Sequence, residues 1–98
     1  MRTICWTSLA LQDLRSIRDF IRRDKPETAR RVALRLKSGV ERLARFPNSG
    51  RPVPIISGIR MVILSPYDVY YRIRPHHIEI LRVYHQRQSQ WLKDESAG

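Results

Sequence analysis

Hydrophobic side chains recur at two different spacings in this chain of 98 residues, first at the spacing of helices and then at that of strands. Residues 2–6 alternate well enough for a short opening strand. Residues 8–23 then carry apolar side chains three and four positions apart, which places them on one helical face. These positions are Ala10, Leu14, Ile17 and Ile21. Either Thr7 or Ser8 can cap this helix, since a hydroxyl there can accept a hydrogen bond from the first turn.

A second helix is predicted over residues 26–46. Its apolar stripe has the same spacing and consists of Ala29, Val32, Leu36, Val40 and Leu43. Asp24 is its candidate N-cap, and Glu27 completes a capping-box arrangement three residues on. Phe46 precedes Pro47, and a residue before proline disfavours the α region, so the helix should end there. A connection of about two residues makes the two helices an antiparallel hairpin.

Three β-rich runs fill most of the remaining chain. They cover residues 60–65, 67–74 and 78–85. The linkers between them are too short for anything but hairpins. Residues 50–58 are expected to form a loop that reaches over the sheet, and the polar tail 86–98 to form a short terminal helix or to fray. The order predicts one α+β domain over residues 1–98, with an N-terminal strand and the antiparallel helical hairpin packed on one face of an antiparallel sheet.

Charge narrows the kind of partner that this domain can have. The formal net charge is +10, from 19 basic and 9 acidic residues, and most of the basic residues are arginines. The lysines are Lys25, Lys37 and Lys93. Arginine forks bind carboxylates and phosphates bidentately, so an acidic partner is expected, either nucleic acid or an acidic protein segment. The alternative is that the charge only keeps the surface soluble.

Two further features concern the compartment. No apolar run approaches the roughly 20 residues of a membrane span, and the first residues lack the apolar core and cleavage site of a signal peptide. The lone Cys5 lies in the predicted first strand, between Ile4 and Trp6, and cannot form an internal disulfide. It is interpreted as a reduced core thiol, which favours a cytoplasmic protein.

Arginines on the predicted strands are the first candidates for a functional site. They are Arg60, Arg72, Arg74 and Arg82. Strand alternation places Arg72 and Arg74 on the same face as Tyr70, and the other two share that face if the register allows it. Such a cluster could stabilise a phosphorane-like charge or bind an acidic partner, and the alternative is a solvated sheet face. Further candidates for partner binding lie on the first helix and after the last strand: Arg15, Arg18, Arg22 and Arg87.

His85 is the candidate for acid–base chemistry. It ends the last predicted strand and could assist the attack of a 2′-hydroxyl on an RNA phosphodiester. The favoured interpretation is structural, with His85 hydrogen-bonded to loop backbone, because a lone histidine without a placed partner supports catalysis only weakly. His76 and His77 point apart on a predicted turn, and no Cys or carboxylate cluster has ligand spacing, so neither a metal nor a cofactor is expected.

Taken in order, the motifs of this chain resemble the RelE/ParE superfamily of bacterial toxins from type II toxin–antitoxin systems. The resemblance spans nearly the whole chain, and its strength comes from order, spacing and length together. The residues that carry it are Ala10, Asp13, Leu14 and Ile17 in the first helix, Pro26, Glu27, Thr28 and Ala29 in the second, Leu43, Pro47, Gly50 and Arg51 around the turn, and Arg60, Tyr71, Arg72, Ile80, Leu81, Val83 and His85 in the strands.

What the resemblance implies about activity depends on the branch. ParE-like members poison DNA gyrase, whereas RelE-like members are ribosome-dependent mRNA endonucleases with basic residues on the second and third strands. Aligned by hand, this chain has Val62 and Asp68 at two positions where those enzymes look basic, and Asp68 would repel phosphate. The resemblance therefore favours a non-enzymatic ParE-like toxin with a role in plasmid stabilisation. In the endonuclease alternative, the site consists of Arg60, Arg72, Arg82 and His85.

The resemblance also implies partners. A cognate antitoxin with an acidic, amphipathic tail is expected to form a toxin–antitoxin hetero-oligomer with the chain, and its carboxylates should meet arginines. The target is DNA gyrase on the favoured interpretation, or the ribosome and its mRNA on the alternative. A third hypothesis, a basic nucleic-acid-binding module without toxicity, is the weakest, because the chain has few stacking aromatic residues and no recognised DNA-reading motif.

Overall fold

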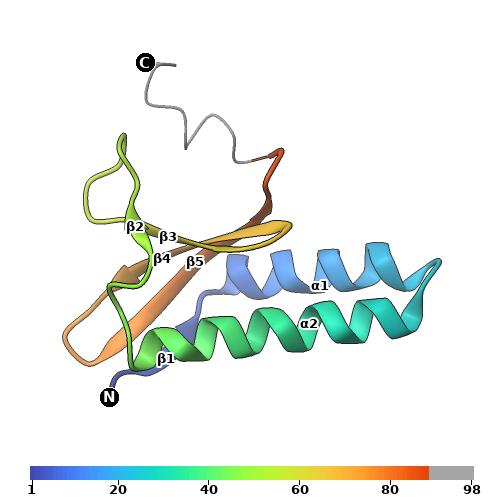
Figure 1. Ribbon diagram of the computed structural model, residues 1–98, viewed down its shortest axis with the longest axis horizontal. Helices are drawn as coiled ribbons and strands as arrows, with labels where there is room; N and C mark the ends of the chain where they lie inside the picture. Colours follow the sequence, from blue (N-terminus) through green and yellow to red (C-terminus); the bar gives the residue numbers. More distant parts are fainter. Residues whose placement is uncertain (89–98) are drawn as a thin grey trace.

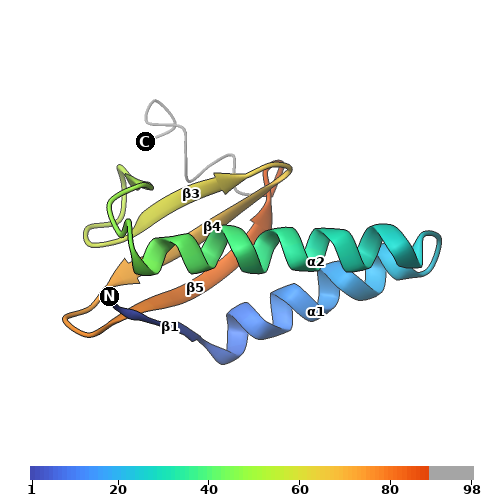
Figure 2. The same cartoon turned by 60° about the horizontal axis from the view of Figure 1, so that its bottom comes forward.

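The structure is a computed structural model that describes residues 1–88, in which a helical hairpin and a five-stranded sheet form two layers (Figure 1). The hairpin consists of α1 (Ser8–Arg22) and α2 (Pro26–Glu41), and a short 3-10 helix, Arg42–Ala44, follows α2. The strands are β1 (Thr3–Trp6), β2 (Arg51–Pro52), β3 (Arg60–Leu64), β4 (Tyr67–Ile73) and β5 (His77–His85). Both helices lie on the same side of the sheet (Figure 2). The predicted α+β order is therefore confirmed. Of the predicted tail 86–98, residues 86–88 form a turn, and residues 89–98 lie outside the described residues.

The strands predicted over residues 60–85 pair antiparallel as expected, and the sheet is mixed because the N-terminal strand adds a parallel pairing that was not predicted. Its strand order is β1-β5-β4-β3-β2. Strands β2 to β5 pair antiparallel, but β1 runs parallel to β5, with Ile4 opposite Ile78 and Trp6 opposite Ile80. The helical hairpin is the cause, because it returns the chain to the end of the sheet where β1 starts. The turn between β4 and β5 also lies at that end (Figures 1 and 2), so β5 sets out in the direction of β1.

The structure confirms the predicted N-cap of α1, but not the predicted N-cap and the predicted end of α2. The Oγ1 of Thr7 accepts a hydrogen bond from the backbone N–H of Ala10 at 3.2 Å, so the predicted cap of α1 is confirmed. The prediction that Asp24 caps α2 is wrong, since Lys25 is the N-cap and no side chain bonds to the first turn. The predicted end at residue 46 is also too late. The winding tightens after Glu41, and Phe46 still donates its N–H to the carbonyl of Arg42 at 2.9 Å.

The interpretation of Cys5 as a core thiol is wrong as well. Cys5 is exposed, while its neighbours Ile4 and Trp6 are half-buried and pack against the main core. Successive residues of a strand point to opposite faces, so burying the two neighbours turns the thiol outward. Among residues 1–88, β1 is an edge strand of the sheet, so its outer edge has no strand partner there.

Two apolar clusters fill the faces of the sheet. The main core lies between the sheet and the hairpin, and its fully buried side chains include Leu36, Val40, Leu43, Val69, Tyr71, Ile78 and Ile80. Burial of each large aliphatic residue contributes about 1.5–3 kcal/mol. A smaller cluster on the other face joins Val53 and Ile59 to Met61 and Tyr70. The loop between β2 and β3 thus covers part of that face, as predicted (Figure 1).

A buried hydroxyl holds the turn that leads from the helices into the sheet. Tyr71 is fully buried, and its Oη donates to the carbonyl of Pro47 at 2.7 Å and accepts from the N–H of Gly50 at 3.0 Å. A Cβ at Gly50 would lie 2.6 Å from the Met61 carbonyl oxygen and from the Tyr71 hydroxyl, so this close approach requires glycine. Arg60 donates to the Gly50 carbonyl from the other side. Pro47, Gly50 and Arg60 therefore meet at one tightly packed turn, which explains their spacing in the sequence.

Candidate functional site

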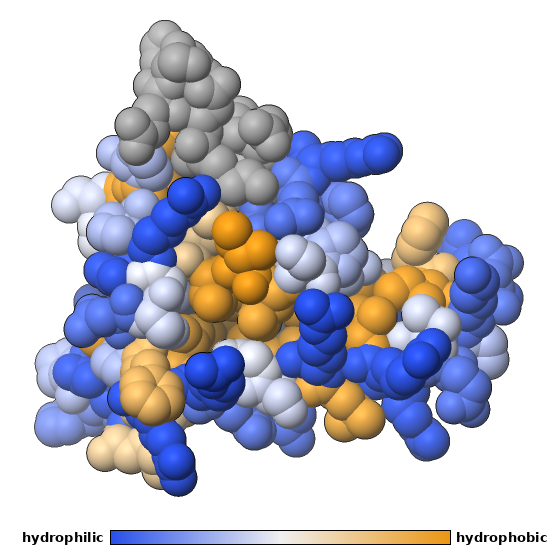
Figure 3. Space-filling model, viewed as in Figure 1, coloured by the Kyte–Doolittle hydropathy of each residue, from blue (hydrophilic) through white to orange (hydrophobic). Residues whose placement is uncertain are grey.

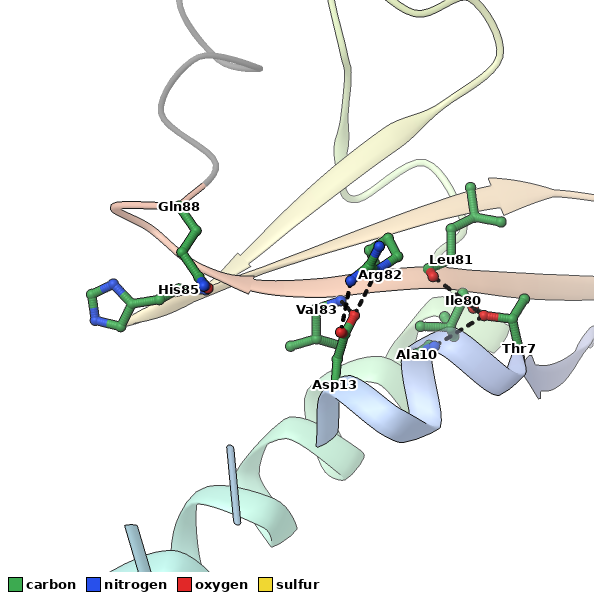
Figure 4. A network of polar contacts seen from close by, with 9 residues as sticks. All are labelled: Thr7, Ala10, Asp13, Ile80, Leu81, Arg82, Val83, His85 and Gln88. Atoms are coloured by element: carbon green, nitrogen blue, oxygen red, sulfur yellow. Dashed lines mark hydrogen bonds and ion pairs between the residues drawn. The ribbon is translucent and has the colours of Figure 1, made fainter. Parts of the chain in front are cut away.

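The carboxylate of Asp13 joins α1 to β5 at the centre of the candidate site (Figure 4). It accepts two hydrogen bonds from Arg82, from Nε at 2.8 Å and from Nη2 at 2.9 Å, and a third from the backbone N–H of Val83 at 2.9 Å. The side chains of Asp13 and Arg82 are 15% and 36% exposed. The pKa of Arg82 is raised above its ordinary value, chiefly by the hydrogen bond to Asp13. Arg82 is thus held as a fixed cation in a structural contact.

The same contact closes an edge of the sheet. Strand β1 ends at Trp6, opposite Ile80, so beyond this point β5 has no strand neighbour on that side among residues 1–88. Asp13 accepts the N–H of Val83, and the side-chain oxygen of Gln88 accepts the N–H of His85 at 3.0 Å. Unpaired strand edges invite pairing with another chain. Along this part of β5, the side chains of Asp13 and Gln88 accept the backbone N–H groups that a neighbouring strand would otherwise bind.

His85 has the backbone contact that the structural interpretation predicts. Its Nδ1 accepts the N–H of Arg87 at 3.2 Å, and its ring meets that of Tyr67 edge to face, with 5.7 Å between the ring centroids. Burial raises the pKa of Tyr67 above its ordinary value. The imidazole points away from Asp13 and Arg82 (Figure 4). The structure therefore does not bring His85 together with an acidic or basic partner from that network.

A groove runs between α1 and the ends of β4 and β5. It has a volume of about 510 Å³, and its lining includes Asp13, Ile17, Phe20, Tyr67, Val83 and His85. Phe20 is 75% exposed, although a phenyl ring gains from burial. The groove thus combines an apolar wall and an aromatic rim with the polar network at its base.

Phe20 and Leu9 lie outside the residues that the sequence predicted for the site, although α1 carries a second pattern beside its main apolar stripe. Leu9, Asp13, Ser16 and Phe20 follow one another at steps of four, three and four residues, so they form a line along one flank of the helix. The main apolar stripe faces the core, and this line lies beside it. Leu9 is 53% exposed. An aspartate within a partly apolar line was the available signal.

The predicted strand arginines are distributed over separate contacts. Arg60 donates to the carbonyls of Asn48 and Gly50, Arg82 binds Asp13, and Arg74 lies 3.6 Å from the Glu79 carboxylate. Arg72 is half-buried opposite Glu79 and has no ion pair within residues 1–88. An irregularity between Tyr70 and Tyr71 shifts the register with β5, so that Arg82 lies opposite Tyr70 while Ile80 lies opposite Tyr71. The expected joint cluster is therefore replaced by local contacts.

The remaining candidate arginines face solvent. Arg15, Arg18 and Arg22 are exposed on α1, and Arg87 is exposed after β5. Arg18 and Arg22 flank Asp19, at 3.6 and 3.4 Å from its carboxylate. Pairs this exposed add about 0–1 kcal/mol and leave the guanidinium groups accessible. A role of these four residues in partner binding remains a prediction.

Asp68 does not face solvent as the phosphate-repulsion argument assumed. It is fully buried on β4, opposite Ile63 and Tyr84, so it cannot meet an RNA phosphate directly. Within residues 1–88, no group of three or more His, Cys, Asp or Glu side chains could hold a metal ion. His76 is exposed in the turn, and His77 begins β5. None of the helices described is long and apolar enough to cross a membrane.

Comparison with known proteins places this arrangement in a class of small bacterial toxins. The chain is 36% identical over 85 residues to the "Toxin RelE2" of Caulobacter vibrioides, covering 87% of this chain and 96% of that protein. Its fold is similar to a chain of the chromosomal ParDE system from P. aeruginosa, with a TM-score of 0.77, 28% identity and coverage of 87% and 96%. It is also similar to a chain of the toxin–antitoxin complex RelBE2 from Mycobacterium tuberculosis, with a TM-score of 0.68, 25% identity and coverage of 86% and 96%.

The family follows from the match of residues 4–90 to the model of the ParE toxin of the type II toxin–antitoxin system parDE. The chain belongs to this family. The resemblance to the RelE/ParE superfamily is thereby confirmed, and the protein is a type II toxin by family.

We expect Asp13→Ala to lower the free energy of unfolding by about 2–4 kcal/mol, because it strands a half-buried guanidinium and a strand N–H. Chemical denaturation of the purified protein measures the effect. Asp19→Ala is the matched control, since Asp19 is an exposed aspartate on the same helix, 54% exposed, and its loss should cost no more than about 1 kcal/mol.

A double variant separates the two parts of this effect. Arg82→Met removes the stranded charge, so Asp13→Ala combined with Arg82→Met should be more stable than Asp13→Ala alone. Equal losses for Asp13→Ala and Asp19→Ala would contradict the structural role of the contact.

Proposed function

We propose that this toxin acts by binding DNA gyrase in the manner of ParE toxins, and that a cognate antitoxin neutralises it. The observation that carries the proposal is the engagement of three of the four candidate catalytic residues in the structure of the toxin itself, with Arg72 as the exception. Arg82 is bound by Asp13, Arg60 by the turn carbonyls, and Nδ1 of His85 by loop backbone. General acid–base catalysis needs a group that can reach substrate and exchange a proton. A binding protein has no such requirement.

The family match supports the same conclusion. The model that matches residues 4–90 is that of a ParE toxin, and the fold is similar to a chain of a ParDE system.

The alternative is a ribosome-dependent mRNA endonuclease of the RelE kind. The relative named RelE2, at 36% identity, favours it. Its site would consist of Arg60, Arg72, Arg82 and His85. For that activity, Arg60 and Arg82 would have to leave their contacts with the turn and with Asp13 when RNA binds.

The antitoxin is expected to occupy the groove between α1 and β5. An amphipathic segment could bury its apolar residues against Phe20 and Ile17, which line this groove. Acidic residues of the same segment could meet Arg15, Arg18 or Arg22, which are exposed on the same helix. A segment that folds on binding fits a groove of this kind, and the result would be a toxin–antitoxin hetero-oligomer.

Gyrase assays with the purified toxin test the proposal. We expect inhibition of plasmid supercoiling and accumulation of cleaved DNA, while mRNA on translating ribosomes stays intact in a parallel reaction. A gyrase reaction without toxin and a ribosome reaction without toxin are the controls. Cuts in mRNA at the ribosomal A site, with gyrase unaffected, would establish the alternative.

Phe20→Ala tests the antitoxin groove. A phenyl ring buried as an interface anchor contributes at least about 2 kcal/mol, so the affinity for the antitoxin should fall about 30-fold or more. Phe46→Ala is the matched control, because Phe46 is 57% exposed and does not line the groove. Calorimetry with the protein encoded beside the toxin gene measures both variants. Equal affinities for the two variants would exclude the groove as the binding site.

A further inference from the structure

The solvent face of α2 and its 3-10 extension carries a line of cations. Arg31, Arg35 and Arg42 follow one another on the side opposite the buried stripe, and all three are exposed. The other exposed cations of the segment are Arg30, Lys37 and Arg45. Hydrophilic side chains stand out from the part of the surface where α2 lies (Figure 3). We call these six residues the arginine face.

The cations of the arginine face outnumber the two exposed carboxylates of the same helix, Glu27 and Glu41. None of its residues forms an ion pair within residues 1–88, whereas on α1 the carboxylate of Asp19 lies between Arg18 and Arg22. Arg31 has one weak contact, with the hydroxyl of Thr28 at 3.4 Å. Like charges four residues apart, such as Arg31 and Arg35, destabilise a helix by about 0.2–0.5 kcal/mol in isolation. An external anion would relieve this repulsion.

We propose that the arginine face binds the phosphate backbone of duplex DNA. From Arg31 to Arg42 the line is about 16 Å long, and a duplex presents roughly ten phosphate charges over that length. A guanidinium binds phosphate bidentately and stays charged at any physiological pH. That this DNA is the segment held by gyrase rests on the proposed function, but the binding itself does not.

DNA fits this face better than an acidic protein segment does. Specific protein interfaces surround apolar and aromatic anchors with a polar rim. Within α2, Leu34 is the one large apolar side chain that is exposed, and it stands among the cations. The groove beside α1 has the opposite character, with Phe20 at its rim. Cations clustered along one helical face, with few apolar anchors, are the electrostatic pattern of phosphate binding.

Fluorescence anisotropy of the full chain with a labelled duplex of about 20 base pairs tests this proposal through its salt dependence. Four phosphate contacts give a loss of affinity of roughly 150-fold between about 50 and 200 mM salt. The variant Arg35→Gln with Arg42→Gln should lower the slope of log affinity against log salt by about 1.8, leaving a loss of roughly 12-fold. Glutamine has a helix propensity close to that of arginine, so the fold should be kept.

The matched control is Arg23→Gln with Arg51→Gln, which removes the same charge from two exposed arginines outside the arginine face. Its slope should stay at the wild-type value. Equal slopes for the two double variants would overturn the proposal, and so would poly-glutamate of matched charge that binds the arginine face as tightly as DNA. Gyrase is absent from the anisotropy measurement, so the two proposals can fail separately. If the toxin binds DNA through the arginine face but does not inhibit gyrase in the supercoiling assay, the proposed function is refuted and the DNA-binding proposal is retained.

Discussion

The three hydrogen bonds that the Asp13 carboxylate accepts from Arg82 and Val83 are the interaction on which the rest of the structure depends. They fasten α1 to β5, and so they set the width of the groove between them. They also occupy the edge of β5 beyond the end of β1. A half-buried arginine needs a carboxylate with good geometry, because the desolvated charge is otherwise costly. The same contact therefore serves stability and withdraws Arg82 from chemistry.

The toxin presents two surfaces of different physical character on its helical layer. The groove beside α1 is apolar with an exposed ring at its rim, and the arginine face of α2 is cationic. Burial of apolar area is insensitive to salt, whereas phosphate binding depends on it steeply. One helical hairpin can therefore bind an amphipathic antitoxin segment and a nucleic acid through adjacent but separate faces. Raising the salt concentration should therefore weaken binding of a nucleic acid to the arginine face much more than binding of an antitoxin segment in the groove.

Local signals in the sequence predicted much of the fold. The Thr7 cap, the apolar stripe of each helix and the placement of Val69 and Tyr71 on the face of β4 opposite Tyr70 depend on residues within a few positions, and the structure confirms them. The parallel pairing of β1 with β5 and the contact of Asp13 with Arg82 join residues about 70 positions apart, and no local pattern encodes them. For the same reason the sequence left open whether the strand arginines share one face. In the structure, Arg60 binds the Gly50 carbonyl in the turn, Arg82 binds Asp13 on α1, and Arg74 pairs with Glu79 on β5.

The central claim is that the toxin acts by binding and that His85 has a structural role. Inhibition of gyrase by His85→Asn and His85→Ala tests it most directly, because the asparagine side chain can still accept the N–H of Arg87 but cannot transfer a proton at neutral pH. The account predicts that His85→Asn inhibits gyrase within a few-fold of the wild type, and that any loss of inhibition in His85→Ala follows its lowered stability. A loss of gyrase inhibition by about 10²–10⁴-fold in both variants, with both still folded, would contradict the account.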